Sequence, residues 1–179
     1  MRARAETGAL TAYAGDGPPR GDGAPGVLLE IDGLHVELPV GEELRPVIHE
    51  ATLSLAVGEA LGLVGESGAG KSMTARAILR LLPEGAKVNG AVRFDGADVL
   101  AFDKGALRRF RASDAAMIFQ DPTTHINPVR KIGDFLTEAL VTNDGVASGE
   151  AARVVAGFLK DVGIDDAERR LDQYPHELS

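Results

Sequence analysis

Polar and apolar residues alternate with a period of two from Val27 to Leu38, and the phase of the alternation changes at Gly33. This pattern predicts a half-buried strand with an irregularity at the glycine. A polar turn at 41–46 separates it from a second alternating strand over 53–57, so the two are expected to pair antiparallel. The apolar run Ala60–Val64 follows at once and predicts a buried strand.

Helical periodicity appears directly after that strand. The spacing of apolar residues predicts a helix over Lys71–Leu82, and Pro83 ends it. Two amphipathic stripes predict later helices, and Asp165–Leu171 is expected to form a further short one. The stripes consist of Ile132, Phe135, Leu136, Ala139 and Leu140, and of Val154, Val155, Phe158, Leu159 and Val162.

Further short strands are expected between these helices. Gly90–Gly96 predicts a strand closed by an Asp-Gly turn, and Ala115–Phe119 predicts a strand buried on both faces. Arg108, Arg109 and Arg111 form a basic cluster, interpreted as a solvated helix face, with a phosphate or partner contact as the alternative. Strands that alternate with helices predict an α/β sheet, although no strand-like run follows Phe119.

Composition narrows the class of protein. The net charge of −8 argues against a general nucleic-acid binder, and the absence of cysteine excludes disulfides and thiolate chemistry. No apolar run is long enough to cross a bilayer, and no secretory signal begins the chain. Residues 1–26 are rich in glycine and proline at their carboxyl-terminal end and predict a disordered tail.

The strongest chemical signal is the sequence from Gly65 to Ser72, which fits the pattern G-x-x-x-x-G-K-S between a predicted strand and a predicted helix. Glycines at 65, 68 and 70 would allow consecutive N–H groups to turn toward one anion. Lys71 would supply a charge for the β- and γ-phosphates, and the Ser72 hydroxyl a ligand for Mg²⁺. The amino-terminal end of the following helix would point at the same anion.

Four segments together resemble the ATP-binding subunits of ABC transporters, and within them the dipeptide, oligopeptide and nickel importers. They are Gly62–Ser72, Met117–Pro122, Asn127–Arg130 and Tyr174–Ser179, and the resemblance extends over 27–179. It implies an α/β P-loop NTPase of ABC type with an antiparallel β-subdomain and a partial parallel core sheet up to about residue 122. A helical subdomain over about 123–179 would follow, in a fold incomplete at its carboxyl-terminal end.

The resemblance also implies roles for individual residues. Gln120 would be the sensor glutamine near the Mg²⁺ and the attacking water, and Leu178 and Ser179 would begin the signature that binds the ATP of an opposite subunit. The expected ATP-binding residues are Gly65, Glu66, Ser67, Gly68, Ala69, Gly70, Lys71, Ser72, Met73 and Gln120, with Ser72 and Gln120 at the metal.

Some features of the family are not matched in this sequence. Walker B with its catalytic Glu, the D-loop and the switch histidine are missing, so the chain is expected to end inside the signature and to be inactive alone. Leu38 stands where an aromatic residue often stacks on adenine, Tyr13 is the only earlier aromatic residue, and Arg45 is an alternative stacking group. His35, His49, His125 and His176 lie in no triad-like context and are interpreted as surface, core or capping residues.

The resemblance implies a function with partners. The chain would be the ATP-binding subunit that energises import of peptides or related solutes, at the cytoplasmic face of the membrane. Its partners would be permease subunits, a second ATP-binding subunit and, indirectly, a solute-binding protein, with no nucleic acid. The alternatives are a non-hydrolysing nucleotide-binding fragment or gene remnant, and another P-loop enzyme such as a small kinase or GTPase.

Overall fold

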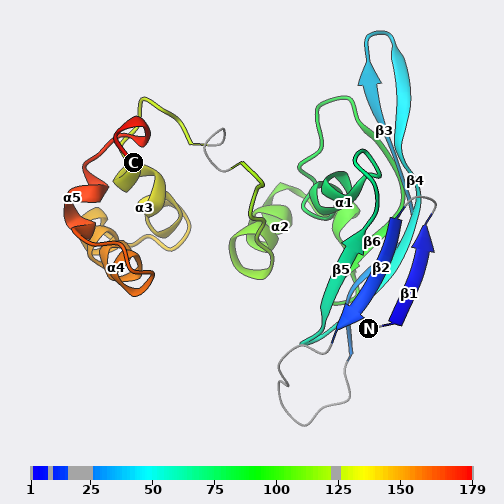
Figure 1. Ribbon diagram of the computed structural model, residues 1–179, viewed down its shortest axis with the longest axis horizontal. Coiled ribbons are helices and arrows are strands. Elements are labelled where there is room, and N and C mark those ends of the chain that lie inside the picture. The colour runs from blue at the N-terminus through cyan, green and yellow to red at the C-terminus, as the bar shows by residue number, and fades with distance from the viewer. Residues whose placement is uncertain (1, 8–9, 16–25, 122–125, 179) are drawn as a thin grey trace. The chain divides into compact units, whose positions relative to one another are not determined.

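The computed structural model describes residues 2–7, 10–15, 26–121 and 126–178 (Figure 1). The chain divides into two compact units, Met1–Arg111 and Ala112–Ser179. The predicted boundary near residue 122 therefore lies within the second unit. No helix among the described residues is long and apolar enough to span a membrane.

An antiparallel sheet of four strands forms the centre of the first unit. The strands β3 (Val27–Val40), β4 (Glu43–Ala56), β6 (Lys87–Phe94) and β7 (Ala97–Asp98) are ordered β4-β3-β6-β7. The predicted antiparallel pairing of the first two alternating segments is confirmed. Both strands run further than the alternation indicates, and their hairpin projects from the rest of the unit (Figure 1).

The change of phase at Gly33 is also confirmed. Gly33 has a φ of 55°, and the register of β3 shifts there against both neighbours, between Ile31 and Leu34 opposite β4 and between Asp32 and His35 opposite β6. An inserted residue with positive φ is the geometry of a bulge that favours glycine. His35 follows the bulge, and its Nδ1 lies 2.7 Å from the backbone oxygen of His49, which agrees with a structural role.

The buried side chains of the first unit lie on one face of this sheet and on the segment after it. The large apolar residues among them include Ile31, Leu34, Val36, Ile48, Val92, Val99 and Phe110. Phe110 packs edge-on against Phe94 and Phe102, with ring centroids 5.1 and 5.8 Å away. Inward positions of β3 alternate with outward ones, as the sequence pattern predicts for a half-buried strand.

A second, three-stranded sheet has the order β1-β2-β5, with β1 at Arg2–Thr7, β2 at Leu10–Gly15 and β5 at Ala60–Val64. The bounds of β5 are those predicted. The prediction that it is buried is wrong, because its residues are half-buried or exposed and Val64 keeps 54% of its surface in solvent. Its partner is β2, in a segment predicted as tail, which pairs antiparallel and satisfies one backbone edge.

The strand predicted over Ala115–Phe119 does not form. These residues have no regular secondary structure, and Ile118 is 95% exposed. A short apolar run becomes a strand only where a neighbouring strand offers its backbone. Among the described residues every strand pair is antiparallel, so the parallel part of the predicted core sheet is not formed by them.

The helices of the first unit are short. The first, α1 (Lys71–Ile78), ends before the predicted Leu82, because Arg80 takes a φ of 52° and breaks the helix ahead of Pro83. The Asp95-Gly96 turn is confirmed, with φ values of 47° and 78°, and the 3-10 turn η1 (Val99–Ala101) follows β7. Then come α2 (Lys104–Arg109) and the π-helical turn η2 (Phe110–Asp114).

The second unit contains α3 (Ile132–Thr142), α4 (Ser148–Asp161), α5 (Ala167–Leu171) and the 3-10 turn η4 (Pro175–Glu177). The three predicted helices are confirmed. The amino-terminal end of α3 meets the end of α5 closely: a Cβ on Gly133 would lie 2.8 Å from the backbone oxygen of Leu171. The stripe predicted on α4 is wrong in part, because Phe158 is 61% exposed while Ala151 and Ala156 are buried.

Candidate nucleotide-binding site

A glycine-rich loop joins β5 to α1 and holds most of the predicted site residues. Gly68 and Gly70 have φ values of 86° and 85°. Residues with a Cβ rarely adopt this backbone conformation. The amide of Ala69 donates to the backbone oxygen of Glu66 over 3.2 Å, which closes a tight turn inside the loop. The same conformation was expected of Gly65, which does not have a positive φ.

The loop ends where α1 begins, and the amino-terminal end of this helix is open for an anion. Gly70 is the N-cap residue and no side chain caps the helix. The first amides of a helix have no partners within the helix, and they carry the positive end of its dipole. A phosphate group is the type of ligand that satisfies these amides.

Thr74 anchors the start of α1 and was not foreseen from the sequence. Its amide and its Oγ1 both donate to the backbone oxygen of Gly70, over 2.8 and 3.0 Å, and the side chain is fully buried. This pair of bonds fixes the N-cap residue that shapes the loop. The spacing of four residues from Gly70 is the only signal in the sequence that points to it.

Lys71 places a positive charge over the loop. Its Nζ donates to the backbone oxygens of Gly65 and Glu66, over 2.8 and 2.7 Å. An ammonium group has three N–H donors, so these two bonds leave the third for a ligand oxygen. The lysine therefore bridges the two sides of the loop and presents its charge beside the free amides of α1.

Ser72 and the residues before the turn lie at the surface of the loop. Ser72, Glu66 and Ser67 are exposed, whereas Ala69 and Met73 are half-buried. Among the described residues no group of three or more His, Cys, Asp or Glu side chains is placed to hold a metal ion. A single hydroxyl fits Mg²⁺ that arrives on phosphate oxygens and keeps several of its waters, which is how this ion binds nucleotide sites.

The remaining predicted site residues lie in the second unit or beyond the described residues. Gln120 is exposed and belongs to the second unit, and Leu178 is 44% exposed, with its amide 3.3 Å from the oxygen of Pro175. Ser179 and His125 lie outside the described residues. The ring of His176 stacks on that of Tyr174 with centroids 5.8 Å apart, which agrees with a structural role.

The groups considered for adenine lie on the β3–β4 hairpin. Leu38 pairs with Arg45 across the two strands, near the projecting end. The side chain of Arg45 is 65% exposed, and its Nη2 lies 3.9 Å from the carboxylate of Glu43. The guanidinium is therefore exposed, and its ion pair with Glu43 lies at the surface. Stacking of Arg45 on a base stays a prediction.

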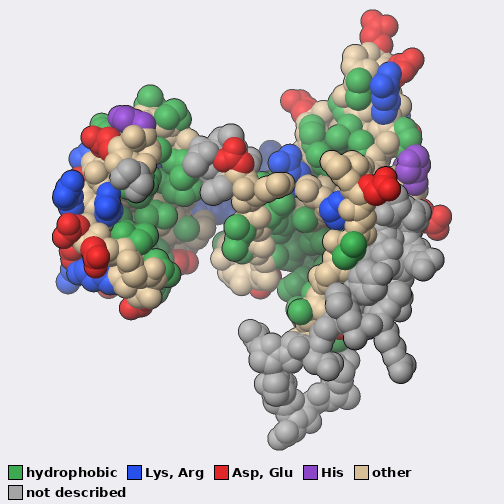
Figure 2. All heavy atoms as spheres, in the orientation of Figure 1, with side chains coloured by type: hydrophobic (Ala, Val, Ile, Leu, Met, Phe, Trp, Pro, Cys, Tyr) green, Lys and Arg blue, Asp and Glu red, His purple; other side chains and the backbone are tan. Residues whose placement is uncertain are grey.

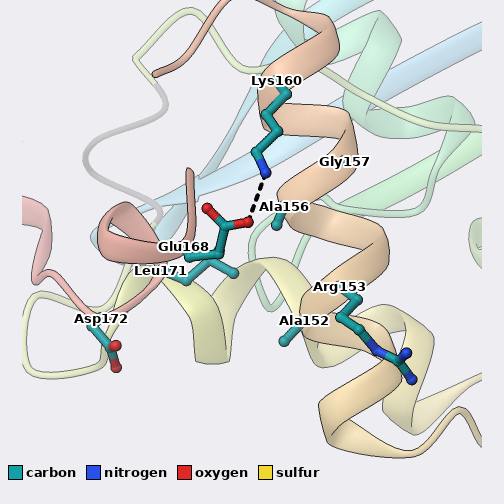
Figure 3. Close-up of a pocket in the computed structure, with 8 residues that line it drawn as sticks. All are labelled: Ala152, Arg153, Ala156, Gly157, Lys160, Glu168, Leu171 and Asp172. Carbon is teal, nitrogen blue, oxygen red and sulfur yellow. Dashed lines mark hydrogen bonds and ion pairs between the residues drawn. The ribbon is translucent and has the colours of Figure 1, made fainter. Parts of the chain in front are cut away.

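A hollow of about 390 Å³ lies between α4 and α5 in the second unit (Figure 3). Lys160 of α4 and Glu168 of α5 point toward each other across it, with a bond of 2.6 Å. This ion pair lowers the pKa of Glu168, mainly through the hydrogen bond from Lys160. Lys160 and Glu168 neutralise each other's charge, and the Nε of Arg153 on the same wall donates to the backbone oxygen of Gly149 over 3.4 Å. It is lined by Ala152, Arg153, Ala156, Gly157, Lys160, Glu168, Leu171 and Asp172.

The surface of the second unit carries mixed charges in the view of Figure 2, with acidic and basic side chains interspersed. Several of them form exposed ion pairs, among them Arg130 with Glu138 at 2.9 Å and Lys131 with Asp172 at 3.0 Å. The hydrogen bond from its amine to Asp172 raises the pKa of Lys131.

Residues 48–179 match the family model described as ABC transporter. The chain belongs to this family. The matched segment contains β5, the glycine-rich loop and α1, and continues through the helices of the second unit. The loop that the resemblance predicts to be Walker A therefore lies within the part of the chain that matches the family.

Curated relatives are ATP-binding proteins of peptide transport. The oligopeptide transport protein OppD of Salmonella typhimurium is 37% identical over 153 residues, which cover 86% of this chain and 46% of the relative. OppD of Escherichia coli is 36% identical over 152 residues, which cover 85% and 45%. The peptidoglycan transport protein YejF of Agrobacterium fabrum is 40% identical over 154 residues, which cover 85% and 28%. The chain spans less than half the length of each of these relatives.

Solved structures confirm the fold. A dimeric structure of the ATP-binding cassette MJ0796 bound to ADP and Pi has a TM-score of 0.64 at 18% identity, covering 85% of this chain and 63% of that one. Another dimeric structure of MJ0796, a bacterial ABC transporter cassette, has a TM-score of 0.63 at 21% identity. The predicted fold class, an α/β P-loop NTPase of ABC type, is therefore correct.

Proposed function

We propose that this chain binds MgATP at the loop Gly65–Ser72 as the ATP-binding part of a peptide importer. The observation that carries the proposal is the pairing of Lys71 with an uncapped helix end: the ammonium bridges Gly65 and Glu66 beside the free amides of α1. Charge and amide donors converge there on the space where the β- and γ-phosphates would lie. The names of the relatives support the transport role.

The roles of the loop residues follow from their positions. The amides of Gly68 and of residues 70–72 would donate hydrogen bonds to the phosphate oxygens, and Lys71 would hold the terminal phosphate through its third donor. Ser72 would ligate Mg²⁺, which neutralises phosphate charge when bound. Glu66, Ser67, Ala69 and Met73 would shape the loop or contact the nucleotide.

The roles outside the loop are proposed on family membership. Gln120 would sense the γ-phosphate and its metal ion, and Leu178 and Ser179 would contribute to the signature that meets the ATP of a second ATP-binding subunit. Permease subunits would be the membrane partners and a solute-binding protein an indirect one, so the chain would work at the cytoplasmic face of the membrane. The relatives named for oligopeptide and peptidoglycan transport support a peptide-like cargo.

Equilibrium titration of the full chain with a fluorescent ATP analogue and Mg²⁺ tests nucleotide binding. We expect Lys71→Ala to weaken binding roughly tenfold to a hundredfold, since a hydrogen bond to a charged group contributes about 1.5–3 kcal/mol. Lys104→Ala is the matched control, because it removes an equal charge at an exposed position on α2.

Two further titrations separate phosphate recognition from binding of the base. AMP lacks the β- and γ-phosphates, so it should compete far less well than ATP, and chelation of Mg²⁺ should weaken ATP binding. Equal competition by AMP and ATP, or equal affinities of the Lys71 and Lys104 variants, would contradict the proposed site.

A further inference from the structure

We infer that Arg80 and Arg111 are positioning residues of the phosphate loop, because together they hold the carboxyl-terminal end of α1 in place. The inference rests on the proposed nucleotide binding and adds to that site two residues outside the loop motif. Arg111 belongs to the basic cluster interpreted from sequence as a solvated helix face, and the structure corrects that interpretation for this residue.

The end of α1 has a backbone conformation that glycine usually adopts. Arg80 has a φ of 52°, its amide donates to the oxygen of Ala77 over 3.0 Å, and the amide of Leu81 donates to the oxygen of Arg76 over 2.8 Å. These two bonds are those of the motif that closes many helices, in which the left-handed position is most often glycine. An arginine there is strained, so its side chain has to contribute something that glycine cannot.

The side chain of Arg80 reaches the segment after β7. Its Nη1 donates to the backbone oxygen of Phe102 over 2.6 Å, with a longer contact of 3.5 Å to that of Val99. Phe102 also packs on the buried Phe110. Arg80 therefore ties the end of α1 to the aromatic part of the core of the first unit.

Arg111, which lies later in the chain, binds the same end of α1. Its Nε donates to the oxygen of Leu79 over 2.8 Å, and its Nη2 to that of Arg80 over 2.7 Å. These oxygens belong to the C-cap residue and to the residue after it, and the planar guanidinium can satisfy both at once. Burial of the guanidinium and the nearby charge of Arg80 lower the pKa of Arg111.

The two ends of α1 are coupled because the helix is short. Eight residues separate the N-cap Gly70 from the C-cap Leu79, a length of about 12 Å at 1.5 Å per residue. A helix of two turns moves as one body. Release of its carboxyl-terminal end would therefore also shift the amides and Lys71 at its amino-terminal end. Thr74 and Ala77, both buried, lie between the two ends.

Three variants of the full chain test the inference by amide hydrogen exchange over residues 66–74 and by titration with a fluorescent ATP analogue and Mg²⁺. Arg111→Gln removes the guanidinium that bonds to Leu79 and Arg80, and Arg111→Lys keeps the charge but replaces the planar guanidinium by a single ammonium group. Arg80→Gly removes the side chain while relieving the backbone strain. Arg109→Gln is the matched control, because it removes an equal charge from the neighbouring exposed residue.

We expect Arg111→Gln and Arg80→Gly to speed exchange in the loop and weaken nucleotide binding by roughly threefold to tenfold, the range typical of residues that act on a site from a distance. Arg111→Lys should fall between Arg111→Gln and the unchanged chain, and Arg109→Gln should match the latter. The decisive variant is Arg80→Gly, since a purely structural cap would become more stable on this change and leave loop exchange as it is.

Two results separate this inference from the proposed function. Failure of the unchanged chain to bind MgATP would contradict the proposed function, and loop exchange in the variants would still decide the inference. The inference would be overturned if loop exchange and nucleotide affinity stayed unchanged in both Arg111→Gln and Arg80→Gly and only the melting temperature fell.

Discussion

Substitution of Gly90 by alanine probes the closest approach of two strands in the first unit. Gly90 has a φ of 91°, and a Cβ there would lie 2.4 Å from the backbone oxygen of Gly33, 2.6 Å from its carbonyl carbon and 2.7 Å from the oxygen of Asp32. All three atoms are backbone, so no side-chain rotation relieves the overlap. The bulge in β3 and the strand β6 would have to separate.

Two costs add in this variant. A left-handed backbone costs a residue with a Cβ roughly 1–2 kcal/mol. The overlap of the added Cβ with backbone atoms of β3 costs, by analogy with overpacking, roughly 1–3 kcal/mol more. We therefore expect the free energy of unfolding to fall by about 2–5 kcal/mol, a large share of the 5–15 kcal/mol typical of a folded domain.

Urea denaturation followed by far-UV circular dichroism measures this loss, and Gly96→Ala is the control. Gly96 has a φ of 78° but open space around its missing Cβ, so its substitution carries only the backbone cost of roughly 1–2 kcal/mol. The difference between the two variants isolates the steric contact with β3. Equal losses, or a loss below about 1 kcal/mol for Gly90→Ala, would refute the reasoning.

Three further substitutions test single contacts. Thr74→Val removes a buried donor to Gly70 and should lower the free energy of unfolding by about 1 kcal/mol in the same urea assay. Lys160→Gln should return the pKa of Glu168 toward its ordinary value in an NMR titration. In the unchanged chain the lowered pKa means that the stabilisation is present at neutral pH and lost as the pH falls through that pKa. Phe158→Ser should leave the melting temperature unchanged in thermal denaturation, because this side chain is 61% exposed.

Local signals in the sequence predicted β5, the bulge at Gly33 and the Asp95-Gly96 turn correctly. The bounds of β5, the phase change at Gly33 and the Asp95-Gly96 turn each depend on a few neighbouring residues, so a short window contains the necessary information. The loop motif likewise lies within eight residues. Features of this kind depend little on the rest of the fold.

Features that depend on distant residues were not predictable in this way. The fork of Arg111 on Leu79 joins positions 32 apart, and no spacing in the sequence marks it. The run Ala115–Phe119 has the composition of a strand, but strand formation needs a partner backbone that composition does not specify. On α4, the helical period was correct and the buried face was correct in part: Val155 is buried as predicted, but Phe158 is exposed and the small residue Ala156 is buried.

A crystal structure of the chain with a non-hydrolysable ATP analogue and Mg²⁺ tests the central claim most directly. The account predicts phosphate oxygens within hydrogen-bond distance of the amides of Gly68 and of residues 70–72 and of the Nζ of Lys71, with Mg²⁺ on the Ser72 hydroxyl. An analogue bound elsewhere in the chain, or phosphates that do not contact Lys71 and the first turn of α1, would contradict it.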